Sequence, residues 1–221
     1  MFLAQPLPDP FLPRPRVIMF DLDGTLVDTM FAFADLAAEV MHKYHGQDRA
    51  EARERYLDTC GIPFHQQLEA IHSDHPHNPP ASDEFESRKR VICEAAPMDE
   101  QTKIGLWKLR GQGIKLVLSS NTGQNFVDEF VEREQFPFDL ALGFGNGLAK
   151  GESHVARTER TLRVARRDIL FVGDSLKDGE LAVTSRVGFV GRLGTFGPSD
   201  FERSFPGVVT VRNVVELPAL F

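Results

Sequence analysis

The stretch that decides the fold is RVIMFDLDGTLVDT, residues 16–29, in which two aspartates one residue apart follow a short apolar run. All four residues of the run Val17–Phe20 are apolar, which is typical of a strand covered on both faces of a sheet. Asp21 and Asp23 come directly after it, where open α/β sheets bind their ligands. Two carboxylates this close repel each other unless a cation neutralises them. The stretch therefore predicts a buried strand with an acidic site at its carboxyl end.

Five further apolar runs resemble this first strand, and helical patterns separate them. The predicted strands are Lys115–Leu118, Leu140–Leu142, Ile169–Val172, Gly188–Val190 and Val208–Val211. The predicted helices between them are Thr102–Arg110, Asn125–Glu134, Glu152–Val164 and Gly179–Ser185. Strands that alternate with helices indicate an α/β fold, a doubly wound, Rossmann-like parallel sheet.

One long interval, residues 30–96, contains helical patterns and no strand pattern. Its first apolar stripe has spacings of three and four and consists of Phe33, Leu36, Ala37, Val40 and Tyr44. Further helices are predicted over Phe64–Ile71 and Phe85–Ala95, with HSDHPHNPPASD, residues 72–83, as a loop between them. The histidines of this loop are better explained as solvated side chains than as metal ligands.

These patterns predict a core domain made of residues 16–29 and 97–221, with a helical domain, residues 30–96, inserted after the first strand. Residues 1–15 contain five prolines, which predicts an extended arm before the folded part. The N-terminus has neither the basic start nor the continuous apolar core of a signal peptide.

Composition narrows the classes of partner. The net charge of −7, without a dominant cluster of Lys and Arg, argues against a nucleic-acid-binding surface. No apolar stretch approaches the length of about 20 residues that a membrane span needs. Cys60 and Cys93 lack metal-ligand spacing and predict reduced thiols. We therefore expect a cytoplasmic protein, a monomer or small homo-oligomer, that binds a small molecule and neither nucleic acid nor membrane.

A second acidic pair follows the fourth predicted strand, in the segment ILFVGDSLKDGE. Asp174 and Asp178 are four residues apart, and if the two strands are neighbours, four carboxylates converge. Such an oxygen-rich site suits Mg²⁺. Alone, the second segment only suggests such a site, and an aspartate that caps a helix is the alternative. A calcium loop is excluded for DLDGTLVDTMFAF, which lacks the alternating oxygen ligands and the terminal Glu.

Other polar residues sit where a phosphate group could be held. Gly24 permits a tight turn, and Thr25 offers a hydroxyl and a backbone N–H to an anion. The second predicted strand ends in Ser119, Ser120 and Asn121, which offer further donors or, equally, a helix cap. Lys150 follows the third strand at a predicted helix start and could neutralise a phosphate.

Together, DLDGTLVDT, SSN, Lys150 and GDSLKD resemble the haloacid dehalogenase-like superfamily of phosphohydrolases, in its C1-capped, phosphoglycolate phosphatase-like branch. The resemblance runs from Arg16 to the C-terminus. It implies that Asp21 is the nucleophile, and that Asp23 is the general acid/base whose backbone carbonyl also binds Mg²⁺. It makes Asp174 and Asp178 the remaining metal ligands.

The resemblance also assigns the other polar positions. Ser120 corresponds to the family's phosphate-binding hydroxyl residue, with Ser119 as the alternative. Lys150 corresponds to the family's lysine. Asn121, Gly24 and Thr25 are expected to bind the phosphate as well. The insert resembles a C1 cap, and its segment GIPFHQQ offers Gly61, Phe64 and His65 as candidates for substrate specificity. A helix start with a hydrophobic staple explains that segment equally well.

The second aspartate distinguishes branches of the superfamily. Dehalogenases lack an acid at the position of Asp23 and need no metal, so the resemblance implies a Mg²⁺-dependent phosphatase that hydrolyses a small phosphorylated metabolite through an aspartyl-phosphate. The alternative is a phosphotransferase or phosphosugar mutase. A phosphonatase would need a Schiff-base lysine, for which Lys43 and Lys89 have no distinguishing context, and a non-catalytic binding protein would not need the full set of acids. Arg186 departs from the pattern, since relatives often carry Gly there.

Overall fold

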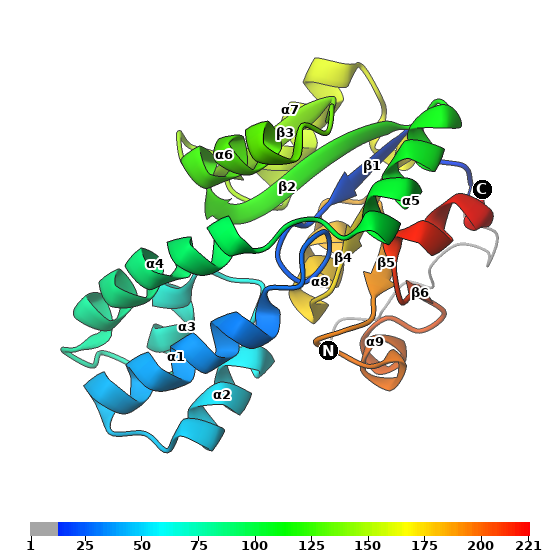
Figure 1. Ribbon diagram of the computed structural model, residues 1–221. Helices are drawn as coiled ribbons and strands as arrows, with labels where there is room; N and C mark the ends of the chain where they lie inside the picture. The colour runs from blue at the N-terminus through cyan, green and yellow to red at the C-terminus, as the bar shows by residue number, and fades with distance from the viewer. Residues whose placement is uncertain (1–12) are drawn as a thin grey trace. The chain divides into compact units, whose positions relative to one another are not determined.

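The computed structural model describes residues 13–221 (Figure 1). The predicted arm, residues 1–15, lies outside the described residues except for its last three. By Cα proximity the chain divides into two compact units. We call them the core unit, which comprises the residues up to Val27 and Met98–Phe221, and the helical unit, Asp28–Pro97.

A six-stranded parallel sheet in the order β3-β2-β1-β4-β5-β6 forms the centre of the core unit. The strands are β1 (Val17–Phe20), β2 (Lys115–Gly123), β3 (Leu140–Phe144), β4 (Ile169–Gly173), β5 (Gly188–Arg192) and β6 (Val209–Val211). Figure 1 shows β1 between β2 and β4. Phe20 pairs in register with Leu118 of β2 and Val172 of β4, so the residues that follow these three lie at one edge of the sheet.

Helices cover both faces of this sheet, which suits the continuous apolar runs of its central strands β1 and β4. Val17 and Met19 of β1 pack in one cluster with residues of α7 (Glu152–Leu162), α8 (Leu176–Thr184) and α9 (Pro198–Ser204). Ile18 and Phe20 alternate to the other face and are equally buried. The remaining elements are α5 (Glu100–Gly111), α6 (Gln124–Glu134) and the 3₁₀ helices Arg166–Asp168 and Val214–Leu220. The predicted doubly wound α/β class is confirmed.

Two differences from the expected elements of the core unit have simple causes. β2 continues to Gly123, so Ser119, Ser120 and Asn121 lie within the strand and not after it. The pairing of β2 with β3 shifts register between Ser119 and Gly123, which lets polar residues continue a strand whose apolar run has ended. Helix α9 was not predicted, because Phe201 is its single buried residue.

The helical unit consists of α1 (Met30–His45), α2 (Arg49–Asp58), α3 (Phe64–Ile71) and α4 (Asn78–Ala95). Its core is aromatic, with Phe85 at the centre in contact with Phe33, Phe64 and Tyr56. Cys60 and Cys93 form no disulfide.

Two features of the helical unit differ from the expectation. The predicted loop 72–83 is wrong in its second half, because α4 begins at Asn78. Pro79 and Pro80 fall in its first turn, where a proline costs no helical hydrogen bond. Helix α2 has no predicted counterpart, because it buries only Ala52 and Tyr56. Along residues 13–221, no helix is both long enough and apolar enough to cross a membrane.

Candidate active site

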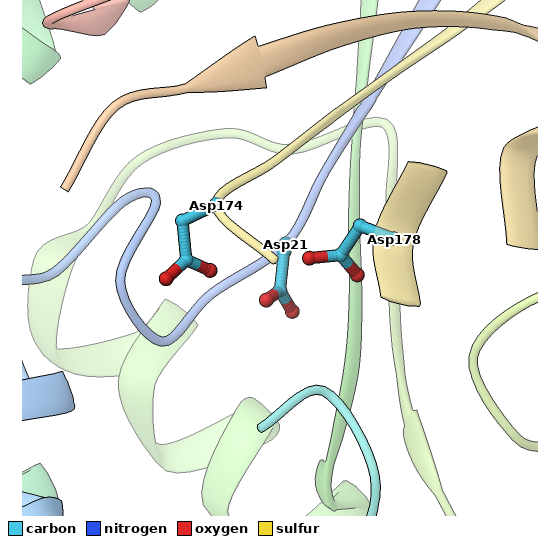
Figure 2. Close-up of side chains that lie close together, drawn as sticks. All are labelled: Asp21, Asp174 and Asp178. Atoms are coloured by element: carbon cyan, nitrogen blue, oxygen red, sulfur yellow. The ribbon is translucent and has the colours of Figure 1, made fainter. Parts of the chain in front are cut away.

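Three buried carboxylates meet at the carboxyl edge of the sheet. Asp21 follows β1, Asp174 follows β4, and Asp178 lies in the first turn of α8. Each offers one oxygen within 4.8 Å of the other two. Figure 2 shows Asp174 and Asp178 on either side of Asp21. β1 and β4 are neighbours in the sheet, which is the condition under which the sequence predicts that the acids converge. Three of the four expected carboxylates come together, and that of Asp23 is not among them.

Lys150 is the cation that faces this cluster. Its Nζ lies 3.1 Å from Oδ1 of Asp21 and 2.7 Å from Oδ1 of Asp178, and the side chain is buried. Burial opposes its charge, yet Asp178 and Asp21 together raise the pKa of Lys150. The backbone N–H of Lys150 donates to Oδ1 of Asn121 at 3.1 Å, which ties the lysine loop to β2.

One lysine does not balance three buried carboxylates. Burial raises the pKa of Asp21 well above its usual value, against the attraction of Lys150, and Asp178 raises it further. Burial, followed by the charge of Asp178, raises the pKa of Asp174 to about 7. Buried carboxylates keep their charge when a cation pairs with them, and a set of oxygen donors suits a hard divalent ion. The donor set therefore fits Mg²⁺.

Helix α8 fixes Asp178 through a capping box. Ser175 is the N-cap, and its backbone N and Oγ donate to Oδ2 of Asp178 at 3.1 and 2.7 Å, which leaves Oδ1 on the side of Lys150. Gly173 makes room for this arrangement. A Cβ at position 173 would lie 2.5 Å from the Asp178 carboxyl group, so only glycine fits there.

The remaining residues of the first motif lie beside the cluster along the chain. The Asp23 carboxylate is not one of the three clustered groups and accepts from Oγ1 of Thr122 at 2.8 Å. Gly24 has φ +80°, and its N–H donates to the carbonyl of Val27 at 2.8 Å, which closes the turn. Thr25 is buried, and its Oγ1 has no hydrogen-bond partner among the described residues. A buried hydroxyl in that state is suited to an incoming ligand.

The two serines of β2 have different hydrogen-bond partners. Oγ of Ser119 lies 2.9 Å from Nδ1 of His154, inside the core. Oγ of Ser120 accepts the N–H of Thr122 at 3.0 Å, which leaves its own proton to donate. Ser120 is therefore the better candidate for a phosphate-binding hydroxyl, as the sequence favoured.

Three residues near the site were not identified from the sequence: Thr122, which donates to Asp23; His154, which contacts Ser119; and Thr195. Oγ1 of Thr195 donates to Oδ2 of Asp174 at 2.6 Å. Thr195 follows β5, the next strand along this edge, which is the only signal that could have found it. His154 is one of seven histidines, and no local pattern marks it.

The specificity candidates in the helical unit have different surroundings. Phe64 is 2% exposed and its ring stacks on Phe85 at 4.0 Å, so it serves the core of that unit and not a substrate. The expectation for Phe64 is thus corrected in favour of the hydrophobic reading of its segment. Gly61 has φ +94° and forms a turn. His65 is exposed and lines an open hollow of about 560 Å³ with residues of α3 and α4.

Comparisons with known proteins agree with this geometry. Residues 18–191 match the family model of the haloacid dehalogenase-like hydrolases. Among the curated proteins, none matches the chain significantly.

Three solved structures are similar over nearly the whole of both chains. A proposed phosphoglycolate phosphatase from Lactobacillus delbrueckii subsp. bulgaricus has 19% identity and a TM-score of 0.80, over 95% of this chain and 99% of its own. A predicted phosphatase from Clostridium acetobutylicum has 18% identity and a TM-score of 0.76, over 94% and 98%. A predicted phosphoglycolate phosphatase from Haemophilus somnus has 18% identity and a TM-score of 0.70, over 95% and 99%.

At these identities the three structures establish a shared fold. The family model spans β1 to β5 and includes every residue of the acidic cluster as well as Lys150. This chain belongs to the haloacid dehalogenase-like hydrolases.

Proposed function

We propose that the protein is a Mg²⁺-dependent phosphatase that hydrolyses a small phosphorylated metabolite through an aspartyl-phosphate on Asp21. The observation that carries the proposal is the buried cluster of Asp21, Asp174 and Asp178 against Lys150. A site that buries this much charge costs stability and is kept where a reaction needs it.

The carboxylates of Asp21, Asp174 and Asp178 would hold Mg²⁺, together with the backbone carbonyl of Asp23. When bound, the ion supplies positive charge that lets an anionic nucleophile approach an anionic phosphate. Lys150 adds a second positive charge at Oδ1 of Asp21. Ser120, Asn121, Gly24 and Thr25 would bind phosphoryl oxygens, and the orphaned hydroxyl of Thr25 is the clearest of these donors.

In the first step, a carboxylate oxygen of Asp21 attacks phosphorus and the bond from phosphorus to the alcohol oxygen breaks. Asp23, protonated, gives its proton to the departing oxygen, so that a neutral alcohol leaves. Thr122 orients Asp23 through the 2.8 Å hydrogen bond between its Oγ1 and the carboxylate.

In the second step, Asp23, now ionised, takes a proton from a water molecule that attacks the phosphorus of the aspartyl-phosphate. The bond from Asp21 to phosphorus breaks, inorganic phosphate leaves, and both aspartates return to their starting states. Asp23 thus moves one proton in each direction, while Asp21 only forms and loses a bond.

The names of two similar structures suggest phosphoglycolate as the first substrate to test. The helical unit would act as the cap that selects the substrate, with Gly61 and His65 as the remaining candidates. Lys43, one of the two lysines that a phosphonatase could use, pairs with Glu84, whose hydrogen bond raises the pKa of the lysine. This disfavours Lys43 as a Schiff-base lysine.

The test is release of inorganic phosphate from phosphoglycolate, other phosphorylated metabolites and an aryl phosphate, with Mg²⁺ and after chelation. We expect turnover only with the metal, and Asp21→Asn to lower kcat by three orders of magnitude or more. The exposed Asp128→Asn is the matched control and should leave kcat unchanged. Turnover by Asp21→Asn at the wild-type rate would refute the proposal. A strict requirement for a bisphosphate activator would indicate a phosphotransferase instead.

A further inference from the structure

His154 is a fully buried titratable residue that the proposed chemistry does not use. It lies in the first turn of α7 with 0% of its surface exposed. Its Nε2 is 3.2 Å from the carbonyl oxygen of Gly143, and its Nδ1 is 2.9 Å from Oγ of Ser119. Because a carbonyl only accepts, Nε2 carries the hydrogen and Nδ1 accepts the hydroxyl of Ser119. One neutral tautomer satisfies both neighbours.

These two hydrogen bonds join three elements at the edge where the site lies. Ser119 belongs to β2, Gly143 to β3, and His154 to α7. Gly143 is itself held by α6, because its N–H donates to Oε1 of Gln124 at 2.6 Å and a Cβ at position 143 would lie 2.6 Å from the Cα of Gln124. His154 therefore joins α7 to two neighbouring strands of the sheet.

Lys150 lies four residues before His154, at the entry to α7. Ser153 of α7 holds the segment that precedes the helix. Its Oγ accepts the N–H of Ala149 at 2.9 Å and donates to the carbonyl of Ala149 at 2.7 Å. Asn121 holds the backbone of Lys150 from the side of β2. The segments 119–121 and 149–154 are thus connected by hydrogen bonds at both ends.

We propose that His154 is a positioning residue, which holds the start of α7 against Ser119 and thereby keeps the ammonium of Lys150 between Asp21 and Asp178. Its effect on catalysis rests on the proposed phosphatase function, whereas its effect on the position of Lys150 does not. Ser119 then belongs to the support of the site and not to its phosphate contacts.

The electrostatics agree with this role. Burial lowers the pKa of His154 to about 4, with the hydrogen bond to Gly143 opposing and the charge of Lys150 adding to the decrease. The imidazole is neutral at neutral pH, so His154 supports Lys150 without placing a second positive charge beside it.

The experiment compares His154→Leu, which removes both hydrogen bonds, with His154→Asn, whose amide can still accept from Ser119. The matched control is Val155→Ala, the next residue of α7, which is equally buried in the apolar core and whose side chain has no hydrogen-bonding atom. The first readout is the ¹⁵N signal of the Lys150 ammonium in metal-free protein, assigned with Lys150→Ala. The second is kcat and KM on an aryl phosphate with Mg²⁺, in both the wild-type and the Lys150→Ala background.

We expect His154→Leu to shift or abolish the Lys150 signal and to lower kcat about tenfold or more, since small misplacements of catalytic groups have effects of this size. His154→Asn should retain most of both. Val155→Ala should lower the melting temperature and leave the signal in place. In the Lys150→Ala background, His154→Leu should cause no further loss of kcat.

An unchanged Lys150 signal in His154→Leu would overturn the inference whatever the activity, as would an equal loss of kcat in both backgrounds. If His154→Leu fails to fold, an unshifted Lys150 signal in Ser119→Ala, which removes the hydrogen bond to His154, overturns it in the same way. A shifted signal in a protein without phosphatase activity would refute the proposed function and leave the positioning role of His154 standing.

Discussion

The core unit buries charged groups at one edge of its sheet, whereas the buried side chains of the helical unit carry no charge and centre on aromatic rings. Asp21, Asp174, Asp178 and Lys150 are all buried in the first. In the second, Phe85 contacts three other rings, and ion pairs such as Arg88–Glu39 involve exposed side chains. Buried rings stabilise a fold, while buried charges cost stability unless they are paired. The contrast assigns the chemistry to the core unit and leaves the helical unit free to vary its surface.

The largest effect we expect separates the two units. Phe85→Ala should lower the unfolding free energy of the helical unit by about 4 kcal/mol, because the deleted ring leaves a cavity between three aromatic neighbours. Urea titration with hydrogen exchange reports the two units separately. The exposed Phe31→Ala, in the same unit, is the control. The Mg²⁺ affinity of the core unit should be unchanged in Phe85→Ala. A loss of Mg²⁺ binding would show that the site depends on the helical unit.

The next effect concerns the charged site itself. Gly173→Ala places a Cβ 2.5 Å from the carboxyl group of Asp178, so Asp178 must move away from Lys150. We expect Mg²⁺ affinity and kcat to fall about a hundredfold each. Gly111→Ala, whose Cβ would meet nothing within 4 Å, is the matched control for the added methyl group. Calorimetric Mg²⁺ titration of both variants measures the difference, and equal affinities would show that Asp178 is not held where the structure has it.

The contrast between the units also explains how much could be predicted from the sequence. The apolar run before Asp21 and the run before Asp174 predict two buried strands, because a buried parallel strand needs a continuous apolar sequence. The acids that follow both runs predict a shared site if the two strands are neighbours, which they are. Turn glycines and paired acids mark the ends of these strands. The core sheet and its three clustered carboxylates therefore follow from local patterns.

What could not be predicted depends on contacts between distant residues. Thr195 donates to Asp174 across 21 positions and His154 contacts Ser119 across 35, and neither belongs to a periodic pattern. The sequence allows Phe64 to face a substrate, whereas its stacking on Phe85 places it in the core of the helical unit. An aromatic residue at a helix start is consistent with either role, and only the position of its partner decides.

Acidification should affect the two units in opposite directions in metal-free protein. His45 and His72 of the helical unit stack with ring centroids 4.2 Å apart, and burial lowers the pKa of both. As the pH falls, the two histidines are therefore protonated in the unfolded chain at a higher pH than in the folded helical unit. The helical unit loses stability as the pH falls below 6.5.

In the core unit two contributions of opposite sign compete between pH 8 and pH 5. His154, with a folded pKa of about 4 against 6.5, withdraws about 2 kcal/mol of stability at pH 5. Asp174, with a folded pKa of about 7 against 3.8, takes up a proton in the folded state and adds about 3 kcal/mol. The raised pKa of Asp21 acts in the same direction as that of Asp174.

Hydrogen exchange at pH 8 and pH 5 in a chelating buffer measures this difference between the units. We expect the core unit to hold or gain stability while the helical unit loses it. A core unit that weakens in parallel with the helical unit would mean that its carboxylates keep their charge without a metal ion.

The smallest effect tests whether the core unit can be stabilised without touching its charges. Arg186 has φ +58° and occupies the residue after the C-cap of α8, in a Schellman turn where the N–H of Val187 donates to the carbonyl of Ala182 and that of Arg186 to Val183. Glycine adopts this conformation without the steric cost that a side chain incurs. Arg186→Gly should therefore raise the unfolding free energy by about 0.5 kcal/mol in urea titrations. Helix α8 also carries Asp178, in the capping box at its other end. An unchanged Mg²⁺ affinity in Arg186→Gly would show that the capping box sets the position of the Asp178 carboxylate, and that the C-terminal turn of the helix does not.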